Sequence, residues 1–367
     1  MQDMEVRDIM NHLESWAHPS LQEEYDNSGL LIGDPKNTCN SALITLDVTE
    51  EVIDEAISQG DDLIIAHHPL IFKGLKKIGQ KHWIDKCIRK AIKNDINIYA
   101  IHTNLDNIHT GVNKKIAEKI GLEELLPLQP KRNLLTKLSV FVPEGHVEQV
   151  TKVMFEAGAG SIGNYDECSF QSTGTGTFRG NEQSNPAIGS RGIREMTKEQ
   201  KIEVLVRKFE LNFIISKMKE AHPYEEVAHF SSDLLNENQE VGSGMIGHLR
   251  QPMEADMFLQ HLKASMNLNL IRHTKLSKKQ ISKVAICGGS GSFLLKNALR
   301  QKANIFITAD FKYHEFFEAN DDIIIADIGH YESEVFTKDL LHDDLTKTFA
   351  NFAFRLSKVD TNPIKYL

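Results

Sequence analysis

Two adjacent histidines follow an apolar run in a pattern that suits metal binding. DLIIA (62–66) reads as a buried strand that ends at His67 and His68, and Pro69 favours an extended backbone at His68. Successive side chains of an extended segment point in opposite directions, so two ions in a dinuclear site can take one histidine each more readily than one ion can take both. A surface turn with two solvated histidines is the alternative.

Two further polar side chains follow the next apolar run, INIYAI (96–101). Asp106 is either an ordinary turn or helix-cap residue or, beside the histidine pair, a hard oxygen ligand for a metal. His102 is either a core histidine or a group that assists the ligands and carries protons. Both residues therefore belong to the candidate site, with different expected roles.

His330 and Glu334 are four residues apart where the run DIIIAD (322–327) gives way to a predicted helix. Side chains at i and i+4 share a helix face at ~5–6 Å, which suits holding one ion or bridging two. An exposed helical pair is the alternative. Five ligands are too many for one tetrahedral structural site, which takes four, so the pattern favours two ions, with Glu334 as the expected bridge.

Two glycine-rich segments could bind a nucleotide or an anion. Gly288–Gly291 joins a predicted strand to a helix, and it is either an anion-binding turn or simply a tight turn. GSGMIG (242–247) matches G-x-G-x-x-G, but we predict no strand before it. It therefore lacks the βαβ context of a dinucleotide site.

The elements that must position these residues alternate between strand and helix. Thr49 and Gly60 have the types expected at the start and end of one predicted helix. Alternation predicts an α/β domain with a mainly parallel, sandwich-type sheet structure, built from residues 1–125 and 241–367, with polar residues at the carboxyl edge of the strands. Residues 126–240 read instead as β-α-β-β-α-β, a ferredoxin-like α+β insertion. The apolar runs that define the outer halves are SALITLD (41–47), DLIIA, INIYAI, KVAIC (283–287), NIFIT (304–308) and DIIIAD.

Composition excludes several classes of protein. The 367 residues include 42 Lys and Arg against 51 Asp and Glu, for a net charge of −9. This balance argues against general nucleic-acid binding, which needs a basic face. No apolar run suits a membrane span or a signal peptide, and the four cysteines lie far apart with no C-x-x-C pair. A cytoplasmic protein is expected.

The motifs occur together in a pattern that resembles the dinuclear-metal-centre proteins of the Ngg-one-interacting-factor-three-like family, whose members are also called GTP cyclohydrolase I type two homologues. The segments that carry the resemblance are Asp26-Asn27-Ser28-Gly29-Leu30, His67-His68-Pro69, His102-x-x-x-Asp106, Gly288-Gly289-Ser290-Gly291 and Gly329-His330-x-x-x-Glu334. His222-Pro223-Tyr224-Glu225-Glu226 is typical of the longer bacterial members. Thr308-Ala309-Asp310 departs from the more usual Thr-Gly-Asp.

The resemblance implies a metal centre and an assembly. It places metal ligands at His67, His68, Asp106, His330 and Glu334, and it implies a toroidal homohexamer with a PII-like inserted domain. The two divalent ions per subunit could be zinc, iron, manganese or cobalt, since imidazole with carboxylate suits each of these metals.

Two classes of function remain open from the sequence. One is a metal-dependent hydrolase acting on a nucleotide or related small molecule, GTP cyclohydrolase-like or a phosphoester hydrolase, with His102 or His314 moving protons. The other is a non-enzymatic hexamer that binds metal or a small ligand as a regulator or scaffold. The sequence has no P-loop, which weakens the GTP reading. Its local basic cluster, 272–279, reads as a solvated loop.

Overall fold

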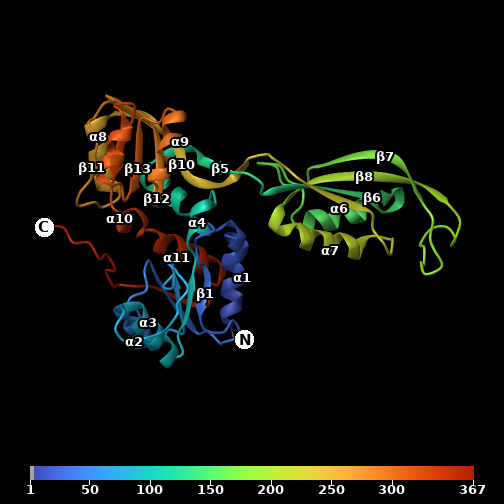
Figure 1. The fold of residues 1–367 in the computed structure, drawn as a ribbon, viewed down its shortest axis with the longest axis horizontal. Coiled ribbons are helices and arrows are strands. Elements are labelled where there is room, and N and C mark those ends of the chain that lie inside the picture. The colour runs from blue at the N-terminus through green and yellow to red at the C-terminus, as the bar shows by residue number, and fades with distance from the viewer. Residues whose placement is uncertain (1–3) are drawn as a thin grey trace. The chain divides into compact units, whose positions relative to one another are not determined.

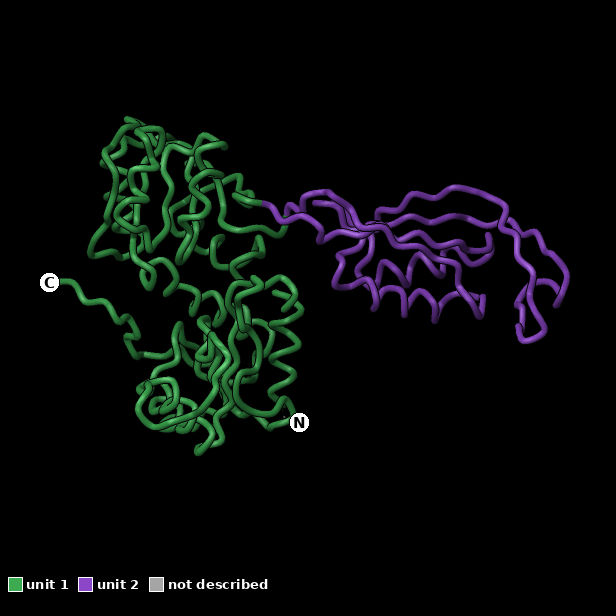
Figure 2. Tube along the Cα trace, viewed as in Figure 1, with its two compact units in different colours: residues 1–129, 240–367 green, residues 130–239 purple. Residues whose placement is uncertain are grey.

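The computed structural model describes residues 4–367, which separate into two compact units (Figure 2). Unit 1 comprises residues 1–129 and 240–367, and unit 2 comprises residues 130–239. The sequence placed the first boundary after residue 125. Strand β5 (Leu122–Lys131) runs past that point without a break.

The first sheet of unit 1 has the strand order β1-β4-β3-β2-β15. Strands β15, β2, β3 and β4 are parallel, and β1 pairs antiparallel with β4. The bounds are β1 (Gly29–Ile32), β2 (Ser41–Thr45), β3 (Leu63–Ala66), β4 (Asn97–Ala100) and β15 (Ala353–Leu356). Because β15 comes from the end of the chain and pairs with β2, both halves of unit 1 contribute to this sheet.

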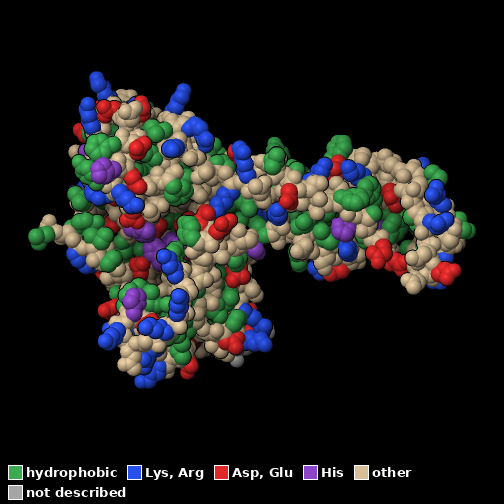
Figure 3. All heavy atoms as spheres, in the orientation of Figure 1, with side chains coloured by type: hydrophobic (Ala, Val, Ile, Leu, Met, Phe, Trp, Pro, Cys, Tyr) green, Lys and Arg blue, Asp and Glu red, His purple; other side chains and the backbone are tan. Residues whose placement is uncertain are grey.

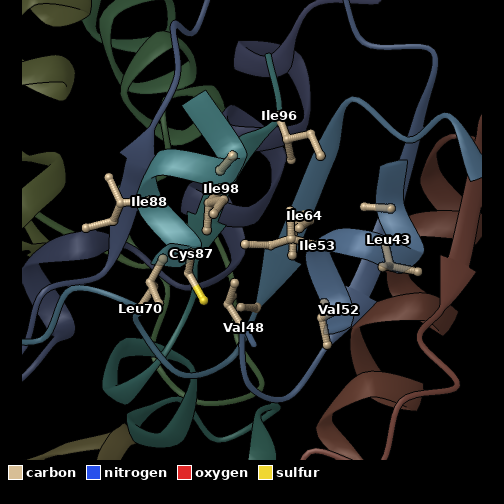
Figure 4. Close-up of a cluster of buried hydrophobic side chains, with 13 residues drawn as sticks. Leu43, Val48, Val52, Ile53, Ile64, Leu70, Cys87, Ile88, Ile96 and Ile98 are labelled. Carbon is tan, nitrogen blue, oxygen red and sulfur yellow. The ribbon is translucent and has the colours of Figure 1, made fainter. Parts of the chain in front are cut away.

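Helices pack on this sheet through the sides that carry their apolar residues. Helix α2 (Glu50–Gln59) begins where the Thr49 side chain accepts the Val52 N–H, and it ends at Gly60 with φ +72°. Figure 4 shows how α2 and α3 (Trp83–Lys93) pack their apolar side chains on Leu43, Ile64 and Ile98 of the strands. The remaining helices of the first half are α1 (Val6–Trp16), α4 (Thr103–Asn107) and α5 (Val112–Ile120).

The second sheet of unit 1 has the order β11-β14-β13-β12-β10-β5. Strands β12, β13 and β14 are parallel, while β10 and β11 pair antiparallel with them. The bounds are β10 (Asn238–Glu254), β11 (Arg272–His273), β12 (Gln280–Ser290), β13 (Ile305–Ala309) and β14 (Ile324–Asp327). The helices are α8 (Ala255–Ser265), α9 (Leu295–Arg300), α10 (His330–Glu334) and α11 (Thr337–Thr348), with a 3-10 helix, η5, at Tyr313–Ala319.

Unit 1 is therefore a mixed α/β structure with more than one sheet (Figure 1). The strands that alternate with helices are parallel in both sheets; antiparallel strands join the first sheet at the β1 edge and the second sheet at β11 and β10, while β15 forms a parallel edge beside β2. The glycine-rich segment 242–247 lies within β10, which already begins at Asn238, so the prediction that no strand precedes it was wrong. It still does not form a strand-turn-helix dinucleotide motif, because the chain continues as strand to Glu254.

Unit 2 is a four-stranded antiparallel sheet in the order β7-β8-β6-β9, with helices α6 and α7 packed on it. The bounds are β6 (Leu135–Pro143), α6 (Val147–Glu156), β7 (Ser169–Phe178), β8 (Glu195–Arg207), α7 (Leu211–Ala221) and β9 (His229–Asp233). The sequence pattern predicted the last strand at 225–230, but β9 begins only at His229. The chain turns first at His222, whose Nδ1 accepts the Tyr224 N–H.

Within residues 4–367, no helix combines the length and the apolar character that crossing a membrane requires.

Candidate metal centre

The polar residues at the strand ends of unit 1 come together in one cluster. His67 and His68 follow β3, His102 follows β4, and α4 begins immediately after His102 and carries Asp106. Helix α10, which follows β14, brings His330 and Glu334 from the other sheet. Figure 3 shows histidine and acidic side chains together in the middle of unit 1. The five residues expected to bind metal thus lie side by side, with the carboxyl edge of the first sheet supplying His67, His68 and Asp106 and the second sheet supplying His330 and Glu334.

His67 is fully buried and directs one ring nitrogen into the cluster. Its Nδ1 lies 2.8 Å from the carbonyl oxygen of Ile101. A carbonyl can only accept, so Nδ1 carries the proton and Nε2 offers a lone pair. Nε2 lies 3.6 Å from Oδ1 of Asp106, and neither atom has a hydrogen-bond partner among the described residues. Two buried acceptors therefore face each other across a gap that has the size and chemistry for a cation.

Glu334 lies between two other imidazoles. Its Oε2 is 2.9 Å from Nε2 of His68 and 3.0 Å from Nε2 of His330, and its Oε1 is 4.0 Å from Nε2 of His67. The side chain is only 3% exposed. A buried carboxylate that reaches three imidazoles has the position that a bridging ligand requires.

Three of the four imidazoles are oriented by carboxylates outside the cluster. Asp47 accepts from Nδ1 of His68 at 2.7 Å, Asp310 from Nδ1 of His330 at 2.6 Å, and Asp26 from Nδ1 of His102 at 2.7 Å. In each ring this contact leaves Nε2 directed toward the centre, which is the usual way proteins fix a histidine ligand.

His102 belongs to the cluster more directly than the sequence indicated. Its ring centroid lies 5.2 Å from that of His67 and 5.3 Å from that of His68, and the three residues can present ligand atoms within 4.8 Å of one another. Asp26, which holds His102, also accepts the Thr103 N–H at 3.0 Å. The structure thus makes His102 a possible donor to an ion as well as a possible proton carrier.

Burial and neighbouring charges shift the pKa values of His67, His68 and Glu334 in different directions. Burial lowers the pKa of His67 to about 3, so this ring is neutral and ready to ligate. Burial also opposes charge on His68, but its hydrogen bonds to Asp47 and Glu334 outweigh that effect and raise the pKa to about 9. Burial would raise the pKa of Glu334, but His330 and His68 hold it well below its usual range.

The pKa of Asp106 shifts in the opposite direction to that of Glu334. Burial, with the nearby charge of Glu334 as a second cause, raises the pKa of Asp106 well above its usual range. The protein without an ion therefore penalises the charged form of Asp106, and a cation at the adjacent lone pair of His67 would remove the penalty.

The glycines of Gly288–Gly291 allow close packing against Glu334. Gly289 has φ +60°, and a Cβ there would overlap Oε1 of Glu334 and lie 3.1 Å from its Cδ. The Gly289 N–H donates to Oγ of Ser333 at 2.9 Å, and its carbonyl accepts from Oγ1 of Thr308 at 3.0 Å. The segment is neither a free loop nor a separate turn: Gly288 and Gly289 belong to the end of β12, where the register with β13 shifts between Ile286 and Ser290, and Gly289 makes room there for the carboxylate.

The donor set fits divalent metal ions. Within residues 4–367, the side chains that can hold an ion form three overlapping groups: His67 with His68 and His102, His68 with His330 and Glu334, and His67 with Asp106 and Glu334. Imidazole nitrogens with carboxylate oxygens suit zinc, iron, manganese or cobalt. Among the described residues, nothing hydrogen-bonds to Nε2 of His67 or Oδ1 of Asp106, and a cation between them would satisfy both atoms.

A cavity of about 400 Å³ opens onto the cluster. Its wall includes the aromatic rings of Tyr25, Phe72 and Phe293 together with His102. His314, expected from the sequence as another proton carrier, is exposed on η5 beside the rings of Tyr313 and Phe317 and is not among the residues that line this cavity. The structure does not bring His314 to the cluster.

Sequence reasoning gave no role to the carboxylates that orient the rings. Asp47 comes two residues after the run SALIT, and Asp310 comes two residues after NIFIT, so their positions at strand ends were a usable signal. Asp26 lies 76 residues from His102 in a loop, where local pattern says nothing about its partner.

Fold and site together define a mixed α/β protein with a buried cluster of histidines and carboxylates that can hold metal ions. The model of the family Duf34/NIF3 (NGG1p interacting factor 3) matches residues 4–363. The chain belongs to this family. The resemblance noted from the sequence motifs is therefore confirmed.

Named relatives and solved structures agree with this assignment. The chain is 39% identical over 364 residues to a "GTP cyclohydrolase 1 type 2 homolog" of Halalkalibacterium halodurans, covering 98% of each chain. It is 36% identical to the protein of the same name from Bacillus subtilis, again over 98% of each. The structure of a Bacillus cereus protein related to NIF3 superposes with a TM-score of 0.89 at 37% identity, covering 100% of both chains.

Proposed function

We propose that this protein binds two divalent metal ions in unit 1 and acts as a metal-dependent hydrolase on a nucleotide or a related small molecule. The observation that carries the proposal is the pair of buried, unpartnered acceptors, Nε2 of His67 and Oδ1 of Asp106, 3.6 Å apart. Such a pair is costly in a protein unless a cation lies beside it.

The residues proposed to hold the ions are those that converge on this gap. They are His67, His68, Asp106, His330 and Glu334. When bound, divalent ions supply an acidified water at neutral pH and polarise an oxygen of the substrate. Asp47, Asp310 and Asp26 keep the histidine rings oriented, so that little reorganisation is needed when an ion binds.

His102 is the residue we propose to move protons. Its Nδ1 is held by Asp26 at 2.7 Å, which leaves Nε2 free on the side of the cavity. A ring anchored at one nitrogen can accept a proton at the other without turning. This arrangement supports an acid–base role for His102, whereas His314 would first have to reach the cavity.

The cavity walls favour a ring-shaped, uncharged part of the substrate. Phe72 lies 6.1 Å from Tyr25 and 6.2 Å from His102, measured between ring centroids. Neither lysine nor arginine is among the described residues that line the cavity, whereas several carboxylates are. We therefore propose that the protein walls bind the aromatic base, and that a triphosphate has no basic cradle here. The names of the curated relatives, "GTP cyclohydrolase 1 type 2 homolog", are compatible with a purine.

A non-enzymatic role as a metal- or ligand-binding regulator is the second candidate. It is favoured by the separate compact unit at 130–239, which has its own hydrophobic core and contributes no residue to the metal cluster. Within this unit, the order β7-β8-β6-β9 with helices after β6 and β8 supports the ferredoxin-like, PII-like insertion that the sequence suggested.

We further propose that the protein assembles as a toroidal homohexamer. Unit 1 exposes large apolar side chains on α2 and α3 and on the loop between β3 and α3, which suits burial against other copies. These side chains are Ile57, Leu75, Ile78, Trp83 and Ile92.

The metal proposal is tested by elemental analysis of the loaded protein and of Glu334→Gln. We expect about two ions per chain in the wild type and the loss of at least one in the variant, because the amide cannot bridge as a carboxylate does. Glu332→Gln is the matched control: it is the same change on the same helix, at a side chain that accepts from Asn362 instead of the histidines.

Activity is tested separately with the protein loaded with each metal in turn and offered nucleotides, nucleosides and phosphoesters. Turnover that depends on metal and falls in Glu334→Gln and His102→Gln, but not in Glu332→Gln, supports the hydrolase. Full metal loading with no turnover on any substrate class would favour the regulator. Retention of both ions by Glu334→Gln would contradict the dinuclear assignment.

A further inference from the structure

Unit 2 contains a cavity of about 450 Å³ on the face of its sheet opposite the helices. Val204 and Val206 of β8 face the helices in the core, so alternation puts Glu199 on the other face. Phe141 of β6 lies on that same face, between the core residues Val140 and Val142. A size of this order suits a small molecule.

Glu199 is a buried carboxylate in this cavity without a cationic partner. The residue is 7% exposed. Its Oε1 accepts the Tyr224 hydroxyl at 3.0 Å. Among residues 4–367, no group donates a hydrogen bond to Oε2, and no Lys, Arg or His forms an ion pair with this carboxylate. On the neighbouring strand, a Cβ at Gly176 would overlap Oε2. The glycine therefore makes room for the carboxylate beside the backbone of β7.

The tyrosine that contacts Glu199 is also held in place. Nε2 of His222 lies 3.0 Å from the carbonyl oxygen of Phe141, so it donates there, and Nδ1 accepts the Tyr224 N–H at 3.1 Å. Burial, together with the hydrogen bond to Glu199, raises the pKa of Tyr224 to about 12, which keeps its hydroxyl a donor. Tyr224 and Phe178 have ring centroids 5.9 Å apart and form an aromatic wall.

The loop between β7 and β8 completes the cavity, and the lining charges are mainly negative. The Asn185 N–H donates to Oε1 of Glu225 at 2.7 Å, which ties this loop to the segment after α7. Glu199, Glu225 and Glu226 line the cavity, and Arg179 is the one basic side chain among its described lining residues. This charge disfavours anions. The described groups able to hold a metal ion all lie in unit 1, so a metal is not indicated here.

We propose that this cavity binds a small organic cation, whose ammonium group pairs with Glu199 and whose apolar part packs on Phe141, Phe178 and Tyr224. An ammonium is attracted both by a carboxylate with an open oxygen and by the faces of aromatic rings. Neither a neutral analogue nor an anion gains these two interactions. The proposal is independent of the metal centre, so either can fail alone.

The test is a titration of the full chain with phenethylammonium, followed by calorimetry and by saturation-transfer NMR. Wild-type protein should bind this probe in the millimolar range expected for a ligand of so few atoms. The isosteric alcohol 2-phenylethanol should bind about tenfold or more weakly, because it lacks the charge-assisted hydrogen bond. The anion 3-phenylpropionate should not bind.

Variants locate the site. Glu199→Gln keeps an acceptor for Tyr224 but removes the charge, and it should lose the preference for the amine. Glu203→Gln is the matched control, because Glu203 lies on the same strand and face but pairs with Lys137 and Lys201 outside the cavity. Equal binding of amine and alcohol by wild type, no amine binding, or equal amine binding by both variants would each overturn the proposal. The comparison of amine with alcohol uses only wild type, so it holds even if a variant fails to fold.

Discussion

Replacing Gly289 by alanine should damage the metal centre without adding or removing any polar group. The added Cβ would overlap Oε1 of Glu334, and the backbone cannot easily retreat because its N–H and C=O are bonded to Ser333 and Thr308. Glu334 must therefore move, although its other oxygen is 2.9 Å from His68 and 3.0 Å from His330. The substitution thus acts on the proposed bridging ligand through shape alone.

The magnitude follows from two separate costs. Alanine in the left-handed region costs about 1 kcal/mol relative to glycine. Loss of one charge-assisted hydrogen bond of Glu334 adds about 1.5–3 kcal/mol. Gly60→Ala is the matched control, since Gly60 has φ +72° but a Cβ there meets no atom within 4 Å. It should incur only the first cost, a fall in Tm of about 2–4 °C for a unit of this size.

The assay combines calorimetric unfolding of the metal-free protein with metal affinity measured by chelator competition. Gly289→Ala should unfold at a lower temperature than Gly60→Ala and bind metal at least about tenfold more weakly than wild type. Gly60→Ala should bind metal normally. Unchanged metal affinity in Gly289→Ala, or equal destabilisation by the two variants, would refute the reasoning that the glycine exists to admit Glu334.

Three other outcomes are expected. Asp310→Asn should weaken metal binding about 10–100-fold, because His330 loses its orienting carboxylate. Asp321→Asn is the control and should leave metal binding unchanged, since Asp321 has the same left-handed backbone conformation as Asp310. In metal-free protein, the stabilising contributions of His67 and His68 should both be present near pH 6.5. His68, with a pKa of about 9, stabilises the folded protein below pH 6.5, and this contribution is lost as the pH rises to 9. His67, with a pKa of about 3, stabilises the folded protein above pH 6.5, and this contribution is lost as the pH falls toward 3. Metal-loaded protein should instead gain stability above pH 6.5, since binding displaces protons, and Tm measured against pH with and without chelator checks both signs. Light scattering should give six times the chain mass of 41.5 kDa, and a monomer at micromolar concentration would exclude the hexamer.

The sequence predicted the candidate residues because polar residues just past parallel strands lie at the carboxyl edge of a sheet, but it did not show that β14 belongs to a second sheet. Apolar runs marked β3, β4 and β14, and the polar residues just beyond each run were the ones that the structure brings together. His67, Asp106 and Glu334 could be found in this way without knowing how the sheets pack. His314, the other proposed proton carrier, follows β13 but lies exposed on η5, because a strand end does not say which way the next turn points.

Sheet membership could not be predicted from local pattern. Strand β15 completes the first sheet beside β2, although the chain between them forms the whole second sheet and unit 2. The strands β5 and β10 were likewise missed, because their apolar residues pack on only part of their length and are interrupted by polar and proline residues. Pairing between strands that are far apart in the chain depends on which strand edges the rest of the fold leaves open. A short stretch of sequence does not contain that information.

The charge of the cluster links these observations to the proposed metal. Carboxylates outnumber the imidazoles that they surround: they are Asp26, Asp47, Asp106, Asp310 and Glu334. Without an ion, protonation of imidazole rings offsets this excess, which is why the pKa of His68 is raised. Rings that ligate an ion must give up a proton, and the ion then supplies the positive charge that the carboxylates require. His67 differs because its buried Nδ1 faces a carbonyl instead of a carboxylate, so this ring stays neutral and has its lone pair available before any ion arrives. A cation that binds in the cluster would therefore find the lone pair of His67 available without displacing a proton from that ring.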